Sequence, residues 1–131
     1  MSKVKDQLLR EEGKKRLSWA ESNMPILVSI RNRFEKEKPL QGIKIGVALH
    51  LEKKTGILLR TLVAGGAQLS AASCNPLTTD DSIAEALDDE MDVFAWSSQT
   101  DDEYYNCLES VIATKPKITT TKSNRFHEFC R

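Results

Sequence analysis

The 131-residue sequence lacks the features that mark membrane, secreted and disulfide-stapled proteins. No apolar run approaches the roughly 20 residues that a bilayer-spanning helix needs, and the chain opens on a polar segment without an apolar signal core. Its cysteines are Cys74, Cys107 and Cys130, an odd number at wide spacing. This pattern argues against a disulfide framework and favours a reducing compartment. We therefore expect a cytoplasmic protein with no membrane contact.

The sequence also lacks an excess of either charge and a clear metal motif. Lys and Arg together number 19, as do Asp and Glu, so no net field attracts nucleic acid. His127, Glu128 and Cys130 lie close together in the sequence, but zinc normally takes four ligands and no second pair is present. We predict no nucleic-acid partner and no metal site.

What the sequence does contain is an alternation of apolar runs with helical patterns. Strands are predicted at residues 43–49, 67–73, 92–96 and 117–121. Helices are predicted at residues 4–21, 24–38 and 54–64, from Thr78 or Thr79 onward, and after Thr100. Alternating strands and helices favour a parallel sheet. We therefore predict a three-layer α/β domain, Rossmann-like or flavodoxin-like, with about four parallel strands and helices on both faces.

Local signals predict how these helices begin and which residues they bury. Asn23 is expected to cap the second helix, and Thr100 with Glu103 forms a capping box before the last one. Gly13 weakens the middle of the first helix. The buried face of the third helix is predicted at Ile57, Leu58, Thr61 and Leu62, and Trp19, Trp96, Cys74 and Cys107 are expected to be packing residues.

The core of the predicted domain spans residues 42–121, with N-terminal helices at 1–41 and a tail at 122–131. Ligands of parallel sheets bind where strands end and helices begin. His50 follows the first strand and residues 75–81 follow the second. One hypothesis is therefore a small-ligand site at these strand ends, built from His50, Glu52, Lys54, Asp80 and Lys122.

Several motifs recur along the chain in the order of a known protein family. They are Trp19–Pro25, Phe34–Gly42, Leu49-His50, Thr61–Ala67, Ser73–Leu77, Val93–Trp96 and Thr100–Tyr104. This run resembles the S-adenosylhomocysteine hydrolase family, in the N-terminal part of its substrate-binding domain. The similarity covers about residues 5–120 in register, and residues 1–131 would then form a single truncated domain of that kind.

The resemblance implies a function in S-adenosylhomocysteine metabolism. The family enzyme cleaves S-adenosylhomocysteine into adenosine and homocysteine, using bound NAD to oxidise the ribose. We expect no cofactor in this chain, because it contains no G-x-G-x-x-G motif and no dinucleotide domain. By resemblance, the substrate-binding positions fall at His50, Glu52, Lys54, Thr55, Asn75, Asp80 and Lys122.

Several of these positions depart from the family pattern. Glu52 and Lys54 stand where the family motif has Thr and Glu, and Asp80 replaces a glutamine. The stretch that carries a catalytic aspartate in the family reads Thr121-Lys122-Ser123-Asn124-Arg125, without a carboxylate. This pattern predicts that the chain has no catalytic residue of its own.

Three hypotheses follow for function. The first is a catalytically silent binding or assembly module, which associates with itself or a protein partner through an exposed apolar patch. The second is part of a split S-adenosylhomocysteine hydrolase that another chain completes. The third is a small-ligand-binding domain with a changed pocket, for which an adenosine-like molecule is one candidate.

Overall fold

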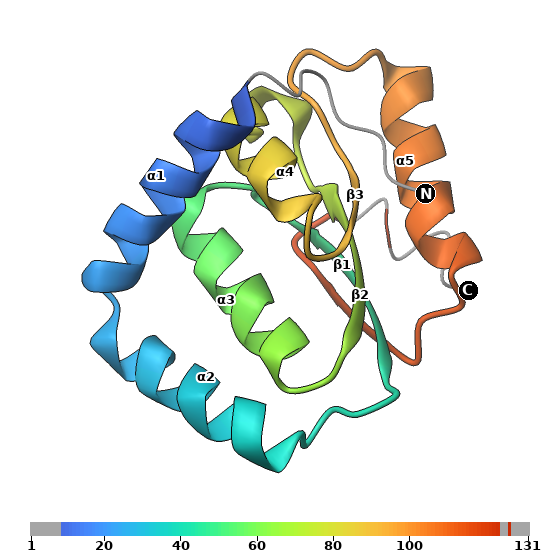
Figure 1. Cartoon of the computed structure of the whole chain (residues 1–131). Coiled ribbons are helices and arrows are strands. Elements are labelled where there is room, and N and C mark those ends of the chain that lie inside the picture. The colour runs from blue at the N-terminus through green and yellow to red at the C-terminus, as the bar shows by residue number, and fades with distance from the viewer. Residues whose placement is uncertain (1–8, 124–125, 127–131) are drawn as a thin grey trace.

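Four parallel strands form the middle layer of the fold (Figure 1). The computed structural model describes residues 9–123 and 126. The strands are β1 Lys44–Leu49, β2 Gln68–Ser73, β3 Asp92–Phe94 and β4 Ile118–Thr121. Their order in the sheet is β3-β2-β1-β4, and Val47 in β1 pairs with Ala71 on one side and Thr120 on the other. This is the order of a Rossmann half rather than of flavodoxin. The prediction of a parallel α/β sheet is confirmed.

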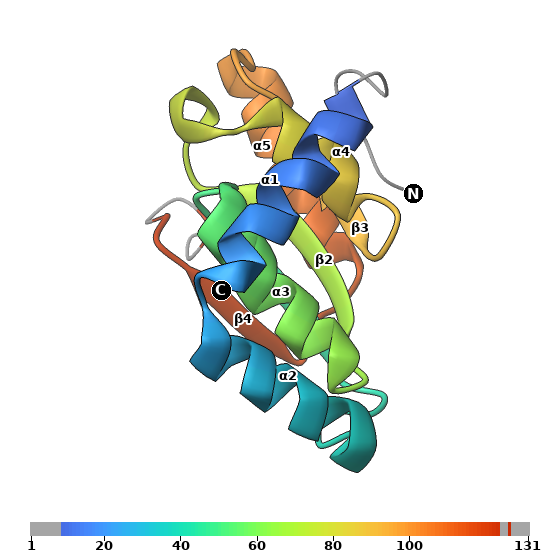
Figure 2. The same cartoon turned by 60° about the vertical axis from the view of Figure 1, so that its left-hand side comes forward.

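Helices cover both faces of this sheet, as predicted. The helices are α1 Arg10–Ser22, α2 Pro25–Glu37, α3 Lys53–Ala64, α4 Asp81–Leu87 and α5 Asp101–Ala113. On one face α3 and α4 pack over the strands, and α1 and α2 lie across them as an outer cover (Figures 1 and 2). On the other face, α5 packs against β1, β2 and β3 and joins the fully buried Phe126 in a second apolar cluster. Phe126 thus anchors part of the segment predicted as a tail.

The junction between the first two helices differs from the prediction. The described part of the first helix begins at Arg10, and residues 4–8 lie outside the described residues. Asn23 does not cap α2 but closes α1, because its side-chain nitrogen donates to the Trp19 carbonyl oxygen at 2.8 Å. Met24 occupies the N-cap position of α2, and Pro25 is its first residue, where no backbone donor is needed.

The helix α3 begins one residue early, and its predicted buried face is confirmed at Ile57 and Thr61 but wrong at Leu58. Leu58 is 39% exposed, whereas Leu59 and Gly56 are buried. The cause is α1, which lies across α3 so closely that a Cβ on Gly56 would be 2.5 Å from the Leu17 side chain. Helical periodicity alone cannot show from which side a neighbouring helix approaches.

The predicted N-cap of α4 is wrong, and the predicted capping box of α5 is confirmed. Asp80, not Thr78 or Thr79, caps α4, and its Oδ1 accepts hydrogen bonds from the Ser82 and Ile83 backbone nitrogens. The threonines are displaced because Pro76–Thr78 form a short 3₁₀ helix, η2. The capping box of α5 is confirmed, since Glu103 N donates to Thr100 Oγ1 and Thr100 N donates to the Glu103 carboxylate.

The packing of α1 on α4 depends on a glycine. Gly13 is buried, and a Cβ at this position would overlap the Ser82 carbonyl oxygen and lie 2.9 Å from the Ala86 Cβ. The residue expected only to weaken the helix is therefore the point at which two helix backbones approach each other.

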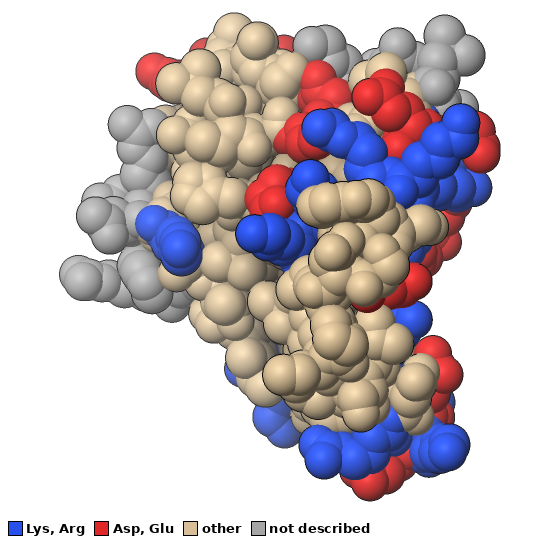
Figure 3. Space-filling model, turned by 90° about the vertical axis from the view of Figure 1, so that its left-hand side faces the viewer, with Lys and Arg blue, Asp and Glu red and all other residues tan. Residues whose placement is uncertain are grey.

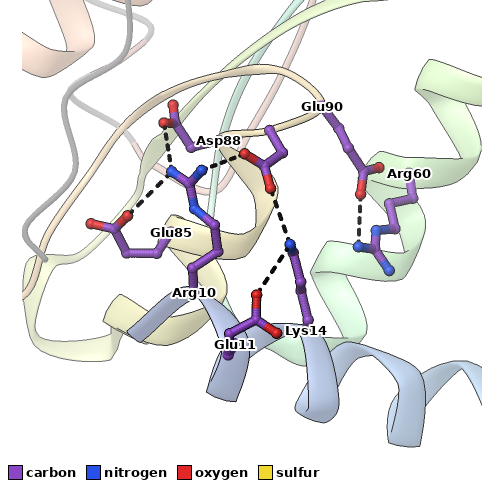
Figure 4. Close-up of polar contacts among 8 residues, drawn as sticks. Arg10, Glu11, Lys14, Arg60, Glu85, Asp88 and Glu90 are labelled. Atoms are coloured by element: carbon purple, nitrogen blue, oxygen red, sulfur yellow. Dashed lines mark hydrogen bonds and ion pairs between the residues drawn. The ribbon is translucent and has the colours of Figure 1, made fainter. Parts of the chain in front are cut away.

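Ion pairs surround this contact. Arg10 of α1 reaches Glu85 at 3.7 Å, Asp88 at 3.4 Å and Asp89 at 2.5 Å, and Glu85 is fully buried (Figure 4). Beside this cluster, Arg60 of α3 pairs with Glu90 at 2.7 Å (Figure 4). On the face seen in Figure 3, basic and acidic side chains lie next to each other at two ends of a broad uncharged surface.

The exposed large apolar residues are spread over several elements. Trp19 is 56% exposed, so its predicted packing role is wrong; its ring instead lies 4.1 Å from the Lys53 ammonium nitrogen. Ile26, Leu77 and Ile118 come from α2, η2 and β4. Isolated apolar residues are normal on protein surfaces. The expectation of an apolar patch for self-association or a partner therefore stays a prediction.

Replacing Gly13 with alanine tests the α1–α4 contact. Alanine normally stabilises a helix interior by about 1 kcal/mol relative to glycine. Here we expect Gly13→Ala to destabilise the fold by about 1–3 kcal/mol through overpacking, measured by urea unfolding. The matched control is Ser18→Ala, on the exposed side of α1, which should change stability little. A Gly13→Ala variant as stable as the original would contradict the contact.

Removing the charge of Arg10 tests the ion cluster. We expect Arg10→Met to lower the free energy of unfolding by about 1–3 kcal/mol, because it removes the Arg10 cation that pairs with the buried Glu85 carboxylate. Arg33→Met, which breaks an exposed pair with Glu37, should cost less than about 0.5 kcal/mol. Adding Glu85→Gln to Arg10→Met should restore part of the loss. Equal effects of the two arginine substitutions would refute the special role of the cluster.

Candidate functional site

The loops at the carboxyl ends of the strands are tied to one another. The order β3-β2-β1-β4 places a topological switch point between β1 and β4, where open α/β sheets bind ligands. Cys74 N donates to the Leu49 carbonyl oxygen, and Lys122 N donates to the Ala48 carbonyl oxygen, both at 3.1 Å. The loops that follow β2 and β4 are thereby fixed to the end of β1.

A pocket of about 530 Å³ opens beside this point. It lies within the range of 300–1,000 Å³ that is usual for small-molecule sites. Its walls come from the loops after β2, β3 and β4 and from the first turns of α5. The lining residues are Cys74, Asn75, Pro76, Leu77, Ser98, Gln99, Asp101, Tyr104, Lys122 and Ser123.

Tyr104 holds two of these walls together from α5. Its hydroxyl lies 2.9 Å from the Cys74 carbonyl oxygen and 2.9 Å from the Ser123 Oγ. Because a carbonyl oxygen can only accept, the tyrosine donates to Cys74 and accepts from the serine. Ser123 N donates in turn to Thr121 Oγ1 at 2.7 Å, which fixes the end of β4.

The third wall is positioned by Asp81, the first residue of α4. Its carboxylate accepts from Ser97 N at 2.7 Å and from Ser97 Oγ at 2.5 Å. The next residue, Ser98, has a φ of 60°, a left-handed conformation that is uncommon for a residue other than glycine. These bonds hold the loop after β3 in place before any ligand arrives.

Cys74 contributes a thiol to the pocket lining. Partial burial raises the pKa of the Cys74 thiol above its usual value, while the nearby Lys122 cation acts in the opposite direction. The prediction of a small buried residue is confirmed for Cys107 but wrong for Cys74, which is half-buried and lines the pocket. A sequence cannot show which of two cysteines the loops will leave accessible.

Of the predicted site residues, Asn75 and Lys122 come together in this pocket. Asn75 also organises its own loop, since its Oδ1 accepts from Leu77 N at 2.9 Å. His50 lies outside the pocket lining but next to η2, with its Nδ1 atom 2.6 Å from Thr78 Oγ1. The histidine and the asparagine loop are therefore neighbours at the same edge of the sheet.

The other predicted residues make structural bonds at helix starts. Glu52 accepts from Thr55 N at 3.0 Å and from Thr55 Oγ1 at 3.3 Å, so it caps α3. Lys54 is exposed on α3. Asp80 caps α4 and pairs with Arg16 of α1. The hypothetical cluster of His50, Glu52, Lys54, Asp80 and Lys122 is thus divided among separate contacts.

Several pocket residues were not among the sequence candidates. Ser98, Gln99, Asp101, Tyr104 and Ser123 complete the lining. Tyr104 lies on the buried side of α5, where a tyrosine usually needs a partner for its hydroxyl group. This need for a hydroxyl partner is the one signal in the sequence that would have pointed to Tyr104 as a pocket residue.

The described residues hold neither a metal-binding cluster nor a membrane-spanning helix. Residues 9–123 and 126 contain no group of three His, Cys, Asp or Glu side chains placed to hold a metal ion. His127, Glu128 and Cys130 lie outside the described residues. None of the helices in the described part is long and apolar enough to span a bilayer.

Comparison with known proteins connects this fold and pocket to a family. The family model described as S-adenosyl-L-homocysteine hydrolase matches residues 1–124. This chain belongs to that family. The adenosylhomocysteinase of Pyrobaculum aerophilum is 49% identical over 119 residues, and that of Sulfurisphaera tokodaii is 44% identical over 128 residues. The S-inosyl-L-homocysteine hydrolase of Methanopyrus kandleri is 45% identical over 116 residues.

The similarity covers most of this chain but a smaller part of each relative. The match to the Pyrobaculum protein covers 90% of this chain and 27% of the relative, and the match to the Sulfurisphaera protein covers 97% and 31%. The match to the Methanopyrus protein covers 88% of this chain and 27% of the relative. The chain therefore spans less than a third of the length of these family members and corresponds to their N-terminal part, as the resemblance in the sequence implied.

The Cys74 environment predicts how its alkylation depends on pH. Because burial raises the pKa of this thiol, its reaction with iodoacetamide should reach half of its maximal rate at a higher pH than that of a free cysteine peptide. Lys122→Met removes the cation that lowers the pKa, so it should move this midpoint further upward. Mass spectrometry of the Cys74 peptide separates it from the other cysteines. A midpoint at or below that of the free peptide would contradict this description.

Proposed function

We propose that this chain is a ligand-binding module of the S-adenosylhomocysteine hydrolase family that does not catalyse the hydrolysis by itself. The observation that carries the proposal is the pocket at the carboxyl ends of the strands, which presents Asn75 and Lys122 from two tied loops. The relatives are named for S-adenosyl and S-inosyl derivatives of homocysteine. An S-nucleosidyl-homocysteine is therefore the ligand class we assign to the pocket.

The lack of catalysis rests on the chemistry of the β4 end. By resemblance, the family places a catalytic aspartate in the stretch that here begins Thr121-Lys122-Ser123. A lysine ammonium group only donates hydrogen bonds and has no acceptor. The hydroxyls of Thr121 and Ser123 are already bonded to the Ala48 carbonyl oxygen and to Tyr104. The end of β4 can therefore bind and orient a ligand, but it offers no carboxylate at the position of the family's catalytic aspartate.

The NAD that the family uses does not fit the first strand–helix turn of this chain. A dinucleotide pyrophosphate needs glycines there and an open helix N-terminus. The turn between β1 and α3 reads His50-Leu51-Glu52, with Leu51 fully buried. The Glu52 carboxylate caps the helix and occupies the position that a phosphate would need. We therefore assign no step of the function to NAD bound at this turn.

A second candidate is a share in a complete S-adenosylhomocysteine hydrolase, with the remaining parts supplied by another polypeptide. The identity of 44–49% to two adenosylhomocysteinases favours it. Lys122 counts against it, because a separate chain does not restore the carboxylate at this position.

Binding and turnover measurements on the same preparation separate these functions. We expect S-adenosylhomocysteine to raise the melting temperature by several degrees, since a ligand at 100 times its dissociation constant stabilises a fold by about 2.7 kcal/mol. With added NAD, no adenosine should form. Turnover by the chain alone would refute catalytic silence. Turnover only after mixing with an S-adenosylhomocysteine hydrolase that lacks this segment would support the second candidate. If S-adenosylhomocysteine does not change the melting temperature, the assignment of an S-nucleosidyl-homocysteine as the ligand is wrong.

A further inference from the structure

Two side chains of opposite charge line the pocket from different walls. Lys122 follows β4, and Asp101 is the first residue of α5. Within residues 9–123 and 126, neither forms an ion pair with the other or with any other side chain. The arginines of the α1–α4 region are paired instead, Arg10 with three carboxylates and Arg16 with Asp80. The pocket thus presents a cation and an anion that have no ion-pair partner among the described residues.

The remaining lining complements these charges. Asn75, Ser98 and Gln99 add amide and hydroxyl groups between the two charged walls, and Pro76 and Leu77 add an apolar side. Leu77 is 87% exposed. A ligand suited to this lining has a positive and a negative group close together, next to a less polar chain.

The walls are held before binding. Tyr104 joins the loops that carry Cys74 and Ser123, and Asp81 holds the loop that leads to Asp101. The capping box between Thr100 and Glu103 fixes the start of α5, so the Asp101 backbone is anchored on both sides. Because the pocket is preorganised, less conformational entropy is lost when a ligand binds.

We infer that Lys122 and Asp101 form a subsite for the zwitterionic amino-acid group of the ligand. The Lys122 ammonium binds the α-carboxylate, and the Asp101 carboxylate binds the α-ammonium group. The thioether chain then lies against Pro76 and Leu77. This inference rests on the proposed function and deepens it, because it assigns the homocysteine end of an S-nucleosidyl-homocysteine to residues of this chain. The charge reversal at residue 122 relative to the family motif is then a change in recognition and not only a loss of catalysis.

A pair of matched ligands tests the subsite by isothermal titration calorimetry on the full chain. S-adenosylhomocysteine and 5′-methylthioadenosine share the nucleoside and the thioether, but the second has no amino-acid group. We expect S-adenosylhomocysteine to bind about tenfold more tightly than 5′-methylthioadenosine, because only the first ligand makes charge-assisted hydrogen bonds through both ends of a zwitterion. Equal affinity of the two ligands overturns the inference.

Substitutions of the two charged residues test whether they cause the preference for S-adenosylhomocysteine. Lys122→Met and Asp101→Asn should each reduce the preference for S-adenosylhomocysteine to nearly one, with little change for 5′-methylthioadenosine. The controls are Lys117→Met and Asp102→Asn, exposed residues of the same types that do not line the pocket, and they should keep the preference. Circular dichroism checks that each variant folds. A preference that survives Lys122→Met overturns the inference.

A third ligand separates the subsite from the proposed function. L-methionine carries the zwitterion and a thioether without a nucleoside, and NMR detects weak binding. If both nucleosides fail to bind, the proposed function is wrong. The subsite then stands only if L-methionine binds and Lys122→Met abolishes that binding, and the absence of methionine binding overturns it.

Discussion

The close approach of α1 to α4 at Gly13 is the constraint on which much of the structure depends. It brings the α1 backbone onto the Ser82 carbonyl and places Arg16 beside Asp80. Asp80 caps α4, and the next residue, Asp81, holds Ser97 in the loop after β3. That loop is one wall of the pocket. The contact between the outer helix α1 and the inner helix α4 is thereby linked to the edge of the sheet where a ligand would bind. The link runs through Asp80 and Asp81, consecutive residues at the start of α4.

The sequence was most informative where a signal is local. The strand and helix alternation predicted the parallel sheet, and the spacing of Thr100 and Glu103 predicted a capping box. It failed where a distant element decides the outcome. The buried position shifted from Leu58 to Leu59 because α1 lies across α3. For the site, Asn75 and Lys122 could be placed at strand ends, but the contribution of Tyr104 depends on a contact between α5 and two loops that no local pattern encodes.

The site combines a retained scaffold with changed chemistry. Backbone ties between β1 and the loops after β2 and β4 keep the switch-point edge of the family fold together. At that edge, Glu52 and Asp80 serve as helix caps. Lys122 introduces a cation into the pocket, opposite the Asp101 carboxylate. A family member can therefore keep a preorganised binding edge while the groups that perform catalysis are replaced by groups that bind, and this is the relation we propose between this chain and its relatives.

The central claim is that the carboxyl-end pocket is where this chain binds its ligand. NMR titration of the ¹⁵N-labelled chain with S-adenosylhomocysteine tests it most directly, because each backbone amide reports its own surroundings. The account predicts that the largest shifts fall on Asn75, Ser98, Asp101, Lys122 and Ser123, while Lys44, Gln68 and Asp92 at the opposite end of the sheet change little. Shifts concentrated at that opposite end, or no shifts at saturating ligand, would contradict it.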